Sequence, residues 1–207
     1  MAEIIIKIER KGAYYDIETE NGSRFKIPMP LLRQFPLTMG TAFDAESYMR
    51  AHIKDAFRFA CQRAAFFLEK RDYSSGLLKE KLTDCGYTEE TAQAAIDYFT
   101  ERGYVDDRRY ACNLIERRSR KVGPYRIRQE LIVKKIDGEL IDEVMNEKLS
   151  DHHDQIALAR QYVEKYVRSR QKQDVKKLKA NALAMLVRKG FSFDTAREAV
   201  RAYFEEE

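Results

Sequence analysis

The chain has no tryptophan, only four prolines and only three cysteines among its 207 residues. So few prolines give little sign of a long flexible linker. Cys61, Cys85 and Cys112 are odd in number and show no CxxC spacing, so we expect reduced thiols rather than a disulfide framework. The three histidines add no ligand pattern, and we therefore expect no metal and no cofactor.

Long apolar runs are also missing. None approaches the roughly 18 residues that a membrane-spanning helix needs, and residues 1–12 lack the apolar core and cleavage site of a signal peptide. We expect a cytoplasmic protein that does not bind membranes. A content of 44% hydrophobic and 35% charged residues is globular, and a net charge of +4 is only mildly basic, so the useful charge signal is local.

Residues 1–50 alternate between apolar and polar side chains, which is typical of strands. Asn21-Gly22 predicts a two-residue hairpin turn of type I′. We predict a three-stranded antiparallel meander, then a short helix around 31–34, and a further helix capped by Asp44. The alternating residues are Ile4, Ile6 and Ile8, then Tyr15, Ile17 and Thr19, then Phe25 and Ile27.

From about Ala45 onward the periodicity is helical and the chain repeats itself. Residues 78–92, 127–141 and 182–196 align without a gap, and each includes a polar helix cap (Thr88, Asp137, Ser192). Units of this size bury little surface alone, so stacking would support them. We predict a mainly α fold, an elongated curved array of three tandem three-helix repeats behind the β meander. The predicted domains are 1–50, 51–105, 106–150 and 151–207, with the first helix of each repeat at 55–71, 107–122 and 154–171.

The turn after the second helix of each repeat favours a left-handed residue. Gly86 and Gly190 supply it in the first and third repeats, whereas the second repeat has Lys135. We expect that turn to close with some strain or with a different geometry.

The stretch 103–136 combines two helices with a dense set of cations. Ala111, Leu114 and Ile115 share one helical face, and Gly123-Pro124 predicts a tight turn into the next helix. The exposed positions carry eight cations against Glu130, an imbalance that favours contact with phosphate or an acidic protein face over a merely solvated surface. The predicted residues are Arg117, Arg118, Arg120, Lys121, Arg126, Arg128, Lys134 and Lys135. Arg118 can instead lay its stem over the core.

Weaker candidates lie elsewhere. Tyr125 either packs across a repeat boundary, the favoured interpretation, or stacks on a base. Asp106-Asp107 is better explained by helix capping than by catalysis. Two further basic segments have partner binding as one interpretation and ordinary surface charge or helix-dipole stabilisation as the other. These are Lys70 and Arg71, and the run Lys165, Arg168, Arg170, Lys172, Lys176, Lys177 and Lys179.

Residues 69–111 and 117–136 resemble the RecX regulatory protein family, and the resemblance extends over about 45–204. The motifs are Arg71 before Ser74, Gly86-Tyr87 after Lys81-Leu82, Gly103–Asp107 with Tyr110-Ala111, and Gly123-Pro124 before Ile127 and Glu130-Leu131. Lys135-Ile136 departs from the usual Lys-Gly pair. The resemblance implies a non-enzymatic modulator that binds the RecA filament on DNA and restrains strand exchange, ATP hydrolysis and co-protease activity. It implies no role for the β-rich start. We expect the chain to act as a monomer.

Two other functions stay open. Three-helix units can act like helix-turn-helix modules, so the chain could bind naked nucleic acid directly, with affinity falling steeply with salt. An enzyme is less well supported, because the sequence has no phosphate-cradling glycine loop, no nucleophile with a positioned base and no metal constellation.

Overall fold

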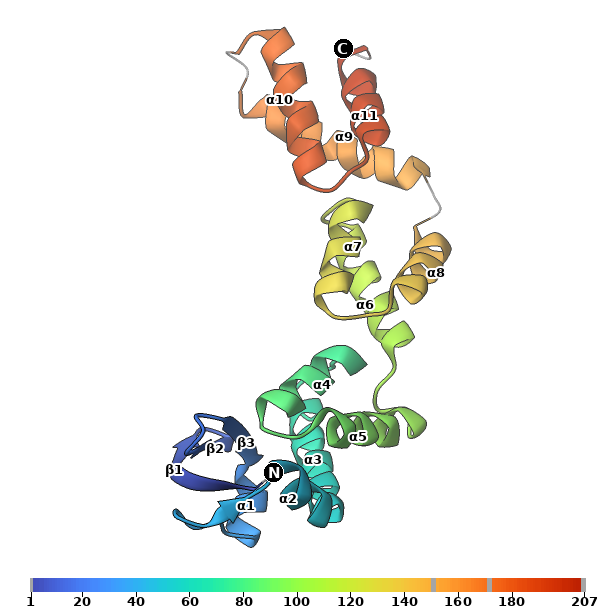
Figure 1. The fold of residues 1–207 in the computed structure, drawn as a ribbon. Coiled ribbons are helices and arrows are strands. Elements are labelled where there is room, and N and C mark those ends of the chain that lie inside the picture. Colours follow the sequence, from blue (N-terminus) through green and yellow to red (C-terminus); the bar gives the residue numbers. More distant parts are fainter. Residues whose placement is uncertain (1, 150–151, 171–172, 206–207) are drawn as a thin grey trace. The chain divides into compact units, whose positions relative to one another are not determined.

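The computed structural model describes residues 2–149, 152–170 and 173–205. The chain forms two compact units, Met1–Asp106 and Asp107–Glu207. The first unit holds a small β-sheet and one three-helix repeat, and the second holds two more repeats (Figure 1). The mainly helical fold with three repeats behind an antiparallel sheet is the predicted one.

The sheet has four antiparallel strands in the order β3-β2-β1-β4. They are β1 (Glu3–Lys11), β2 (Tyr14–Thr19), β3 (Arg24–Pro28) and β4 (Ala42–Phe43). The predicted meander is correct for the first three strands. β4 was not predicted, because two residues are too few to show a periodicity. Ile5, Ile17, Ile27 and Phe43 fill the core beneath the sheet.

The buried positions of β1 do not follow the alternation of Ile4, Ile6 and Ile8. Ile5 is buried at 1% exposure, whereas Ile6 is 52% exposed. Ile5 pairs with Thr19 and Lys7 with Glu18, so the register shifts between Ile5 and Lys7. This bulge inserts an extra residue and reverses the alternation, which is why Ile8 packs on the core that Ile5 begins.

The turn between β2 and β3 is also not the predicted type I′ turn. Gly22 has a φ of +80°, but Asn21 is not among the residues with positive φ. The amide of Gly22 donates to the carbonyl of Thr19, and the amide of Thr19 donates to Ser23. This is the three-residue loop in which a type I turn is followed by a left-handed glycine.

Two short helices flank β4 in the chain: α1 (Met29–Gln34) precedes it and α2 (Ala45–Ala51) follows it. As predicted, Asp44 caps α2, accepting a hydrogen bond from the amide of Ser47. That bond helps to lower the pKa of the Asp44 carboxyl to about 2.

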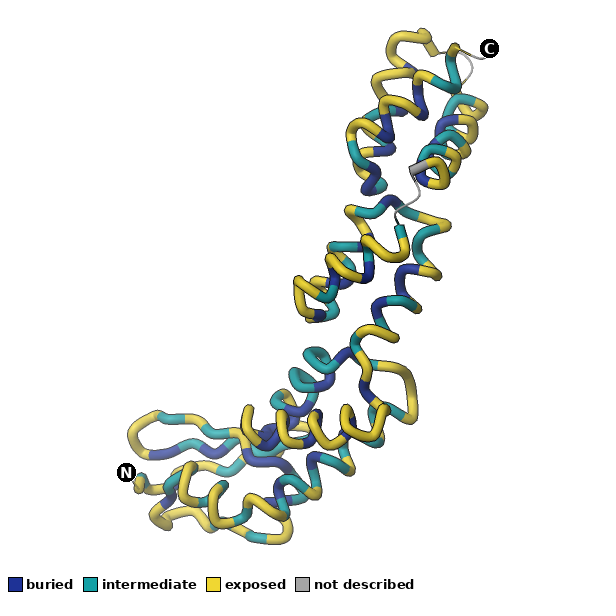
Figure 2. The backbone as a smooth tube through the Cα atoms, turned by 90° about the vertical axis from the view of Figure 1, so that its right-hand side faces the viewer, coloured by how far each residue is buried: buried dark blue, intermediate teal, exposed yellow. Residues whose placement is uncertain are grey.

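Three helices make up each repeat. Repeat 1 is α3 (Ile53–Leu68), α4 (Ser75–Asp84) and α5 (Glu89–Glu101). Repeat 2 is α6 (Asp107–Ser119), α7 (Pro124–Val133) and α8 (Gly138–Lys148). Repeat 3 is α9 (His152–Arg168), α10 (Val175–Arg188) and α11 (Phe193–Glu205). Each has its own apolar core, and Figure 2 shows the buried residues on the inward sides of the helices.

The first helix of each repeat is shorter than predicted at its C-terminal end. α3 ends at Leu68 and α6 at Ser119 rather than at 71 and 122. After α6 the amides of Lys121 and Val122 both bond to the carbonyl of Arg118, which turns the chain toward Gly123. α9 ends at Arg168, and its predicted end, Gln171, lies outside the described residues, as does Lys172.

The three turns after the second helices share one hydrogen-bond pattern. In each, a left-handed residue (Gly86, Lys135 or Gly190) is followed by a buried residue whose amide reaches back five positions to the helix. Lys135 is the only described non-glycine residue with a positive φ, +57°. It closes the turn with the same geometry as glycine, so the strain expected of a side chain is present there. The back-reaching amides and their acceptors are Tyr87 and Leu82, Ile136 and Leu131, and Phe191 and Leu186.

The sheet is part of the first unit rather than an appendage to it. Ala56 of α3 is buried in the sheet's core, and Phe59 packs on both that core and the core of repeat 1. Gly86 lies so close to the sheet that a Cβ there would meet Pro28 N and Tyr14 Cβ at 3.1 Å. The sheet and repeat 1 therefore fold against each other.

Candidate partner-binding surface

The turn between α6 and α7 carries a group of exposed cations, which we call the basic turn: Arg117, Arg120, Lys121 and Arg126. Within the described part of the chain, no carboxylate lies within ion-pair distance of the first three. Among the described carboxylates, Glu130 is the one at ion-pair distance from Arg126, whose Nε lies 3.9 Å from it. The basic turn is therefore positive and accessible.

Main-chain contacts with repeat 3 hold the basic turn in place. The amide of Gly123 donates to the carbonyl of Lys189, and the amide of Tyr125 donates to Gly190, both at 3.0 Å. A Cβ on Gly123 would lie 2.3 Å from the carbonyl carbon of Gly190. Only glycine permits this approach. We call this pair of bonds the glycine clasp, and it places the cations on rigid backbone.

A side chain reinforces the clasp. The hydroxyl of Tyr162 on α9 donates to the carbonyl of Lys121 at 2.8 Å, and the Nζ of Lys189 lies 4.1 Å from the Tyr162 ring centroid. Tyr125 was expected to pack its ring across the repeat boundary. Tyr125 is instead 63% exposed, and the contact with repeat 3 that the structure records for it is the main-chain bond to Gly190.

Arg118 does not belong to the accessible cations. It follows the buried face of α6 and forms an ion pair with Glu130 of α7. This hydrogen bond raises the pKa of the Arg118 guanidinium. Its Nε is buried without a hydrogen-bond partner in the described structure. Arg118 thus ties α6 to α7.

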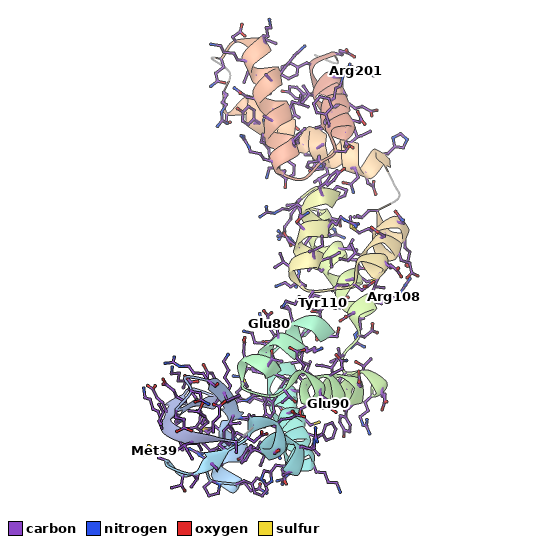
Figure 3. The ribbon with its side chains drawn as sticks, in the orientation of Figure 1. Met39, Glu80, Glu90, Arg108, Tyr110 and Arg201 are labelled. Carbon is purple, nitrogen blue, oxygen red and sulfur yellow. The ribbon has the colours of Figure 1, made fainter. Side chains whose placement is uncertain are left out.

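Arg128 is likewise engaged inside repeat 2. It forms an ion pair with Asp142 of α8, which lowers the pKa of the Asp142 carboxyl and raises that of the guanidinium. Arg108 of α6, labelled in Figure 3, contacts α8 through Glu143 at 2.8 Å and Glu147 at 2.6 Å. Nothing local in the sequence indicated these pairs, because each joins residues on different helices.

Lys134 and Lys135 lie at the far end of α7 from the basic turn. Lys134 follows Arg126 by eight residues, which is about 12 Å along a helix. The eight predicted cations therefore do not form one uniform face. Four gather at the basic turn, two connect helices and two lie beyond the C-terminus of α7.

In the first unit, Lys70 and Arg71 follow α3 and lie over aromatic rings. The Lys70 Nζ is 3.9 Å from the Phe66 ring centroid, and the Arg71 guanidinium is 4.5 Å from that of Tyr73. Phe67 bridges the two rings at centroid distances of 6.1 and 6.0 Å. This alternation of cations and rings is suited to stacked, anionic ligands.

In repeat 3, Lys176 and Lys177 are exposed in the first turn of α10. Cations there face the positive end of the helix dipole, so the dipole does not explain them. Lys165 and Arg168 differ, because they lie in the last turn of α9, where the dipole favours positive charge.

The described residues contain no group of three or more His, Cys, Asp or Glu side chains placed to hold a metal ion. Of the pair Asp106-Asp107, for which capping and catalysis were weighed, Asp107 is the first residue of α6. The three cysteines are free thiols, and burial raises the pKa of Cys61 and of Cys85. No described helix has both the length and the apolar composition needed to span a membrane.

Comparison with known proteins matches these repeats one by one. The models of the first, second and third three-helix domains of RecX match residues 60–99, 106–145 and 153–200, more than half of the chain. The regulatory protein RecX of Stenotrophomonas maltophilia is 36% identical over 141 residues, which cover 68% of this chain and 84% of the relative. That of Clostridium acetobutylicum is 26% identical over 207 residues, covering 98% and 97%.

Solved structures agree in fold. A crystal structure of regulatory protein RecX superposes with a TM-score of 0.64 at 25% identity and covers both chains fully. RecX from Lactobacillus salivarius gives a TM-score of 0.67 at 18% identity, covering 73% of this chain and 99% of that one. With three matching domain models and a relative at 36% identity, the chain belongs to the RecX family of regulatory proteins.

Proposed function

We propose that this chain binds the RecA filament on DNA and lowers its ATP hydrolysis, strand exchange and co-protease activity. It acts as a cytoplasmic monomer through non-covalent contacts and catalyses no reaction of its own. The regulatory names of its relatives support this role.

The observation that carries the proposal is the basic turn. Arg117, Arg120 and Lys121 have no carboxylate partner among the described residues, so an anionic partner gains their full attraction. Arg pairs bidentately with both carboxylate and phosphate. Because the glycine clasp fixes the main chain at Gly123 and Tyr125, binding need not order the backbone of the turn and loses entropy mainly in the cationic side chains.

The other predicted residues have different roles in the proposed binding. Lys134, Lys135, Lys176 and Lys177 add electrostatic attraction to the second unit's contact, and Lys70 and Arg71 extend contact to the first unit. Arg118 and Arg128 act indirectly, because their ion pairs hold α6, α7 and α8 together.

The test is to add the chain to RecA on single-stranded DNA with ATP. We expect the rates of ATP hydrolysis and strand exchange to fall as the chain approaches a stoichiometric ratio to RecA. Unchanged rates at that ratio would contradict the proposal.

A second candidate is direct binding of single-stranded nucleic acid, which the cation–aromatic group Phe66, Phe67, Lys70, Arg71 and Tyr73 favours. It predicts tight binding to a naked oligonucleotide that weakens steeply with salt and that Phe66→Ala reduces. Strong filament binding with weak oligonucleotide binding would favour the first candidate instead.

A further inference from the structure

The turn that carries Arg120 and Lys121 lies beyond the end of α6, so hydrogen bonds to its own main chain decide how rigid it is. The peptide unit between Lys121 and Val122 is bonded at both ends. Its N–H, on Val122, donates to the carbonyl of Arg118 at 3.1 Å. Its C=O, on Lys121, accepts from the hydroxyl of Tyr162 at 2.8 Å. A peptide unit held at both ends is not free to rotate about the soft dihedral angles beside it.

Tyr162 reaches this turn from repeat 3. Its ring packs on the core of that repeat and lies 6.3 Å from the ring of Phe191, centroid to centroid. The Nζ of Lys189 lies 4.1 Å from the centroid of the same ring, and the Lys189 carbonyl accepts the hydrogen bond from Gly123. One side chain therefore contacts both sides of the junction, with its ring in repeat 3 and its hydroxyl on repeat 2.

The hydroxyl is the part of Tyr162 that core packing does not explain. A phenylalanine ring would occupy the same space and would still lie beside the Lys189 ammonium. Tyr166, one turn further along α9, provides the contrast. Its ring also packs on the core of repeat 3 and lies 4.2 Å from the Arg170 guanidinium, but its hydroxyl makes no hydrogen bond within the described residues.

Joining the two repeats does not require this hydroxyl either. The main-chain bonds of Gly123 and Tyr125 already connect repeat 2 to repeat 3. The Tyr162 hydroxyl acts instead on the peptide unit of Lys121, a cation of the basic turn. A surface that is ordered before its partner arrives loses less entropy on binding, and a partner binds only the fraction of molecules in which the surface is ordered.

We propose that the Tyr162 hydroxyl is a positioning group for the basic turn. It acts through the Lys121 carbonyl rather than by touching the partner, and it holds Arg120 and Lys121 in the arrangement that an anionic partner meets. Repeat 3 thus contributes an uncharged side chain to the binding surface of repeat 2. This inference rests on the proposed function, because it takes the RecA filament as the partner of the basic turn.

The test measures the binding of the full chain, Tyr162→Phe and Tyr166→Phe to RecA filaments on single-stranded DNA by fluorescence anisotropy. Each variant loses one hydroxyl from the same helix and keeps its ring. We expect Tyr162→Phe to bind about fivefold more weakly, which corresponds to the loss of one hydrogen bond worth about 1 kcal/mol. Tyr166→Phe is the matched control and should bind as the parent chain does. Equal affinity of the two variants would overturn the inference.

The salt dependence of the affinity separates positioning from the loss of a binding charge. Tyr162→Phe keeps every cation, so its affinity should fall with salt as steeply as that of the parent chain. Lys121→Ala removes a cation, and its affinity should fall less steeply. If Tyr162→Phe shows the shallower dependence of Lys121→Ala, its hydroxyl has a role other than positioning.

Hydrogen exchange examines the turn without any partner. In Tyr162→Phe the amides of Val122 and Gly123 should exchange about fivefold faster, whereas amides in the middle of α7 should not change. The melting temperature should fall by about 2–4 °C. Unchanged exchange at both amides would contradict the inference. A fall of about 10 °C or more would assign the hydroxyl to folding instead.

Failure of this inference is distinguishable from failure of the proposed function. If the parent chain does not bind RecA filaments, the proposed function fails, and hydrogen exchange still decides whether the hydroxyl orders the turn. If the parent chain binds and Tyr162→Phe binds equally well, the proposed function stands and Tyr162 is not a positioning residue.

Discussion

At the scale of single residues, Lys135 is the place where the sequence departs most from its own repeat. It adopts the left-handed conformation that Gly86 and Gly190 adopt in the other repeats. A side chain in that conformation is crowded against the following carbonyl. The turn nevertheless closes, because the hydrogen bond from Ile136 to Leu131 and the burial of Ile136 outweigh the strain.

We expect Lys135→Gly to raise the free energy of unfolding by about 1 kcal/mol, since it removes this strain. Urea denaturation measures the change. A loss of stability would mean that the Lys135 side chain contributes more than its backbone costs.

Ile5 and Ile6 provide a second residue-level test, because the bulge in β1 buries one and exposes the other. Ile5→Ala should cost about 2–4 kcal/mol of stability through a cavity in the core beneath the sheet. Ile6→Ala should change stability by less than about 0.5 kcal/mol. Thermal or chemical denaturation compares them, and the reverse order would show that β1 faces the other way.

These two residues also mark what the sequence could not predict. The alternation of Ile4, Ile6 and Ile8 was a sound strand signal, and β1 is a strand. Its inward face depends on a bulge, however, and a bulge leaves no mark in the pattern of side chains. A run of apolar residues such as 4–6 fits either face.

At the scale of elements, the glycine clasp determines how α7 meets repeat 3. The Gly123-Pro124 turn was predicted from sequence as a break between two helices. Its second role was not predictable, because it depends on the backbone of Gly190, which is distant in sequence. The repeats themselves were predictable, since their cores recur at matching positions such as Tyr87 and Phe191.

Because of the glycine clasp, we expect the small substitution Gly123→Ala to lower stability strongly. Gly123 has a φ of −74°, which any residue tolerates, so the cost of Gly123→Ala comes from the Cβ placed against Gly190. We expect a loss of about 3 kcal/mol and faster hydrogen exchange at the Tyr125 amide. Gly138→Ala is the matched control, because a Cβ there meets nothing within 4 Å. Similar stability of both variants would argue against the clasp.

The pattern of cations was predicted less completely than the helices that carry them. All eight central cations were identified, but their pairing was not, because Asp142 faces Arg128 only after α7 and α8 have packed. Between Arg117 and Lys135 the sequence has one carboxylate, Glu130, and it pairs chiefly with Arg118. The remaining unpaired charge at the basic turn is therefore a property of the folded repeat.

At the scale of the whole molecule, a net charge of +4 is too small to explain attraction to an anionic polymer. The attraction instead depends on where the positive charge is unpaired. Electrostatic attraction of this kind acts mainly on association and weakens with salt. If the attraction arises at the basic turn, a chain with the same charges at other exposed positions should no longer be attracted to the anionic polymer.

The most direct measurement is therefore the affinity of two matched variants for RecA filaments on single-stranded DNA, by fluorescence anisotropy. One carries Arg117→Glu, Arg120→Glu and Lys121→Glu, and the other carries Arg33→Glu, Lys54→Glu and Arg197→Glu, all at exposed positions. We predict at least a tenfold loss for the first, little change for the second and the same melting temperature for both. Equal affinity of the two variants would contradict a binding role for the basic turn.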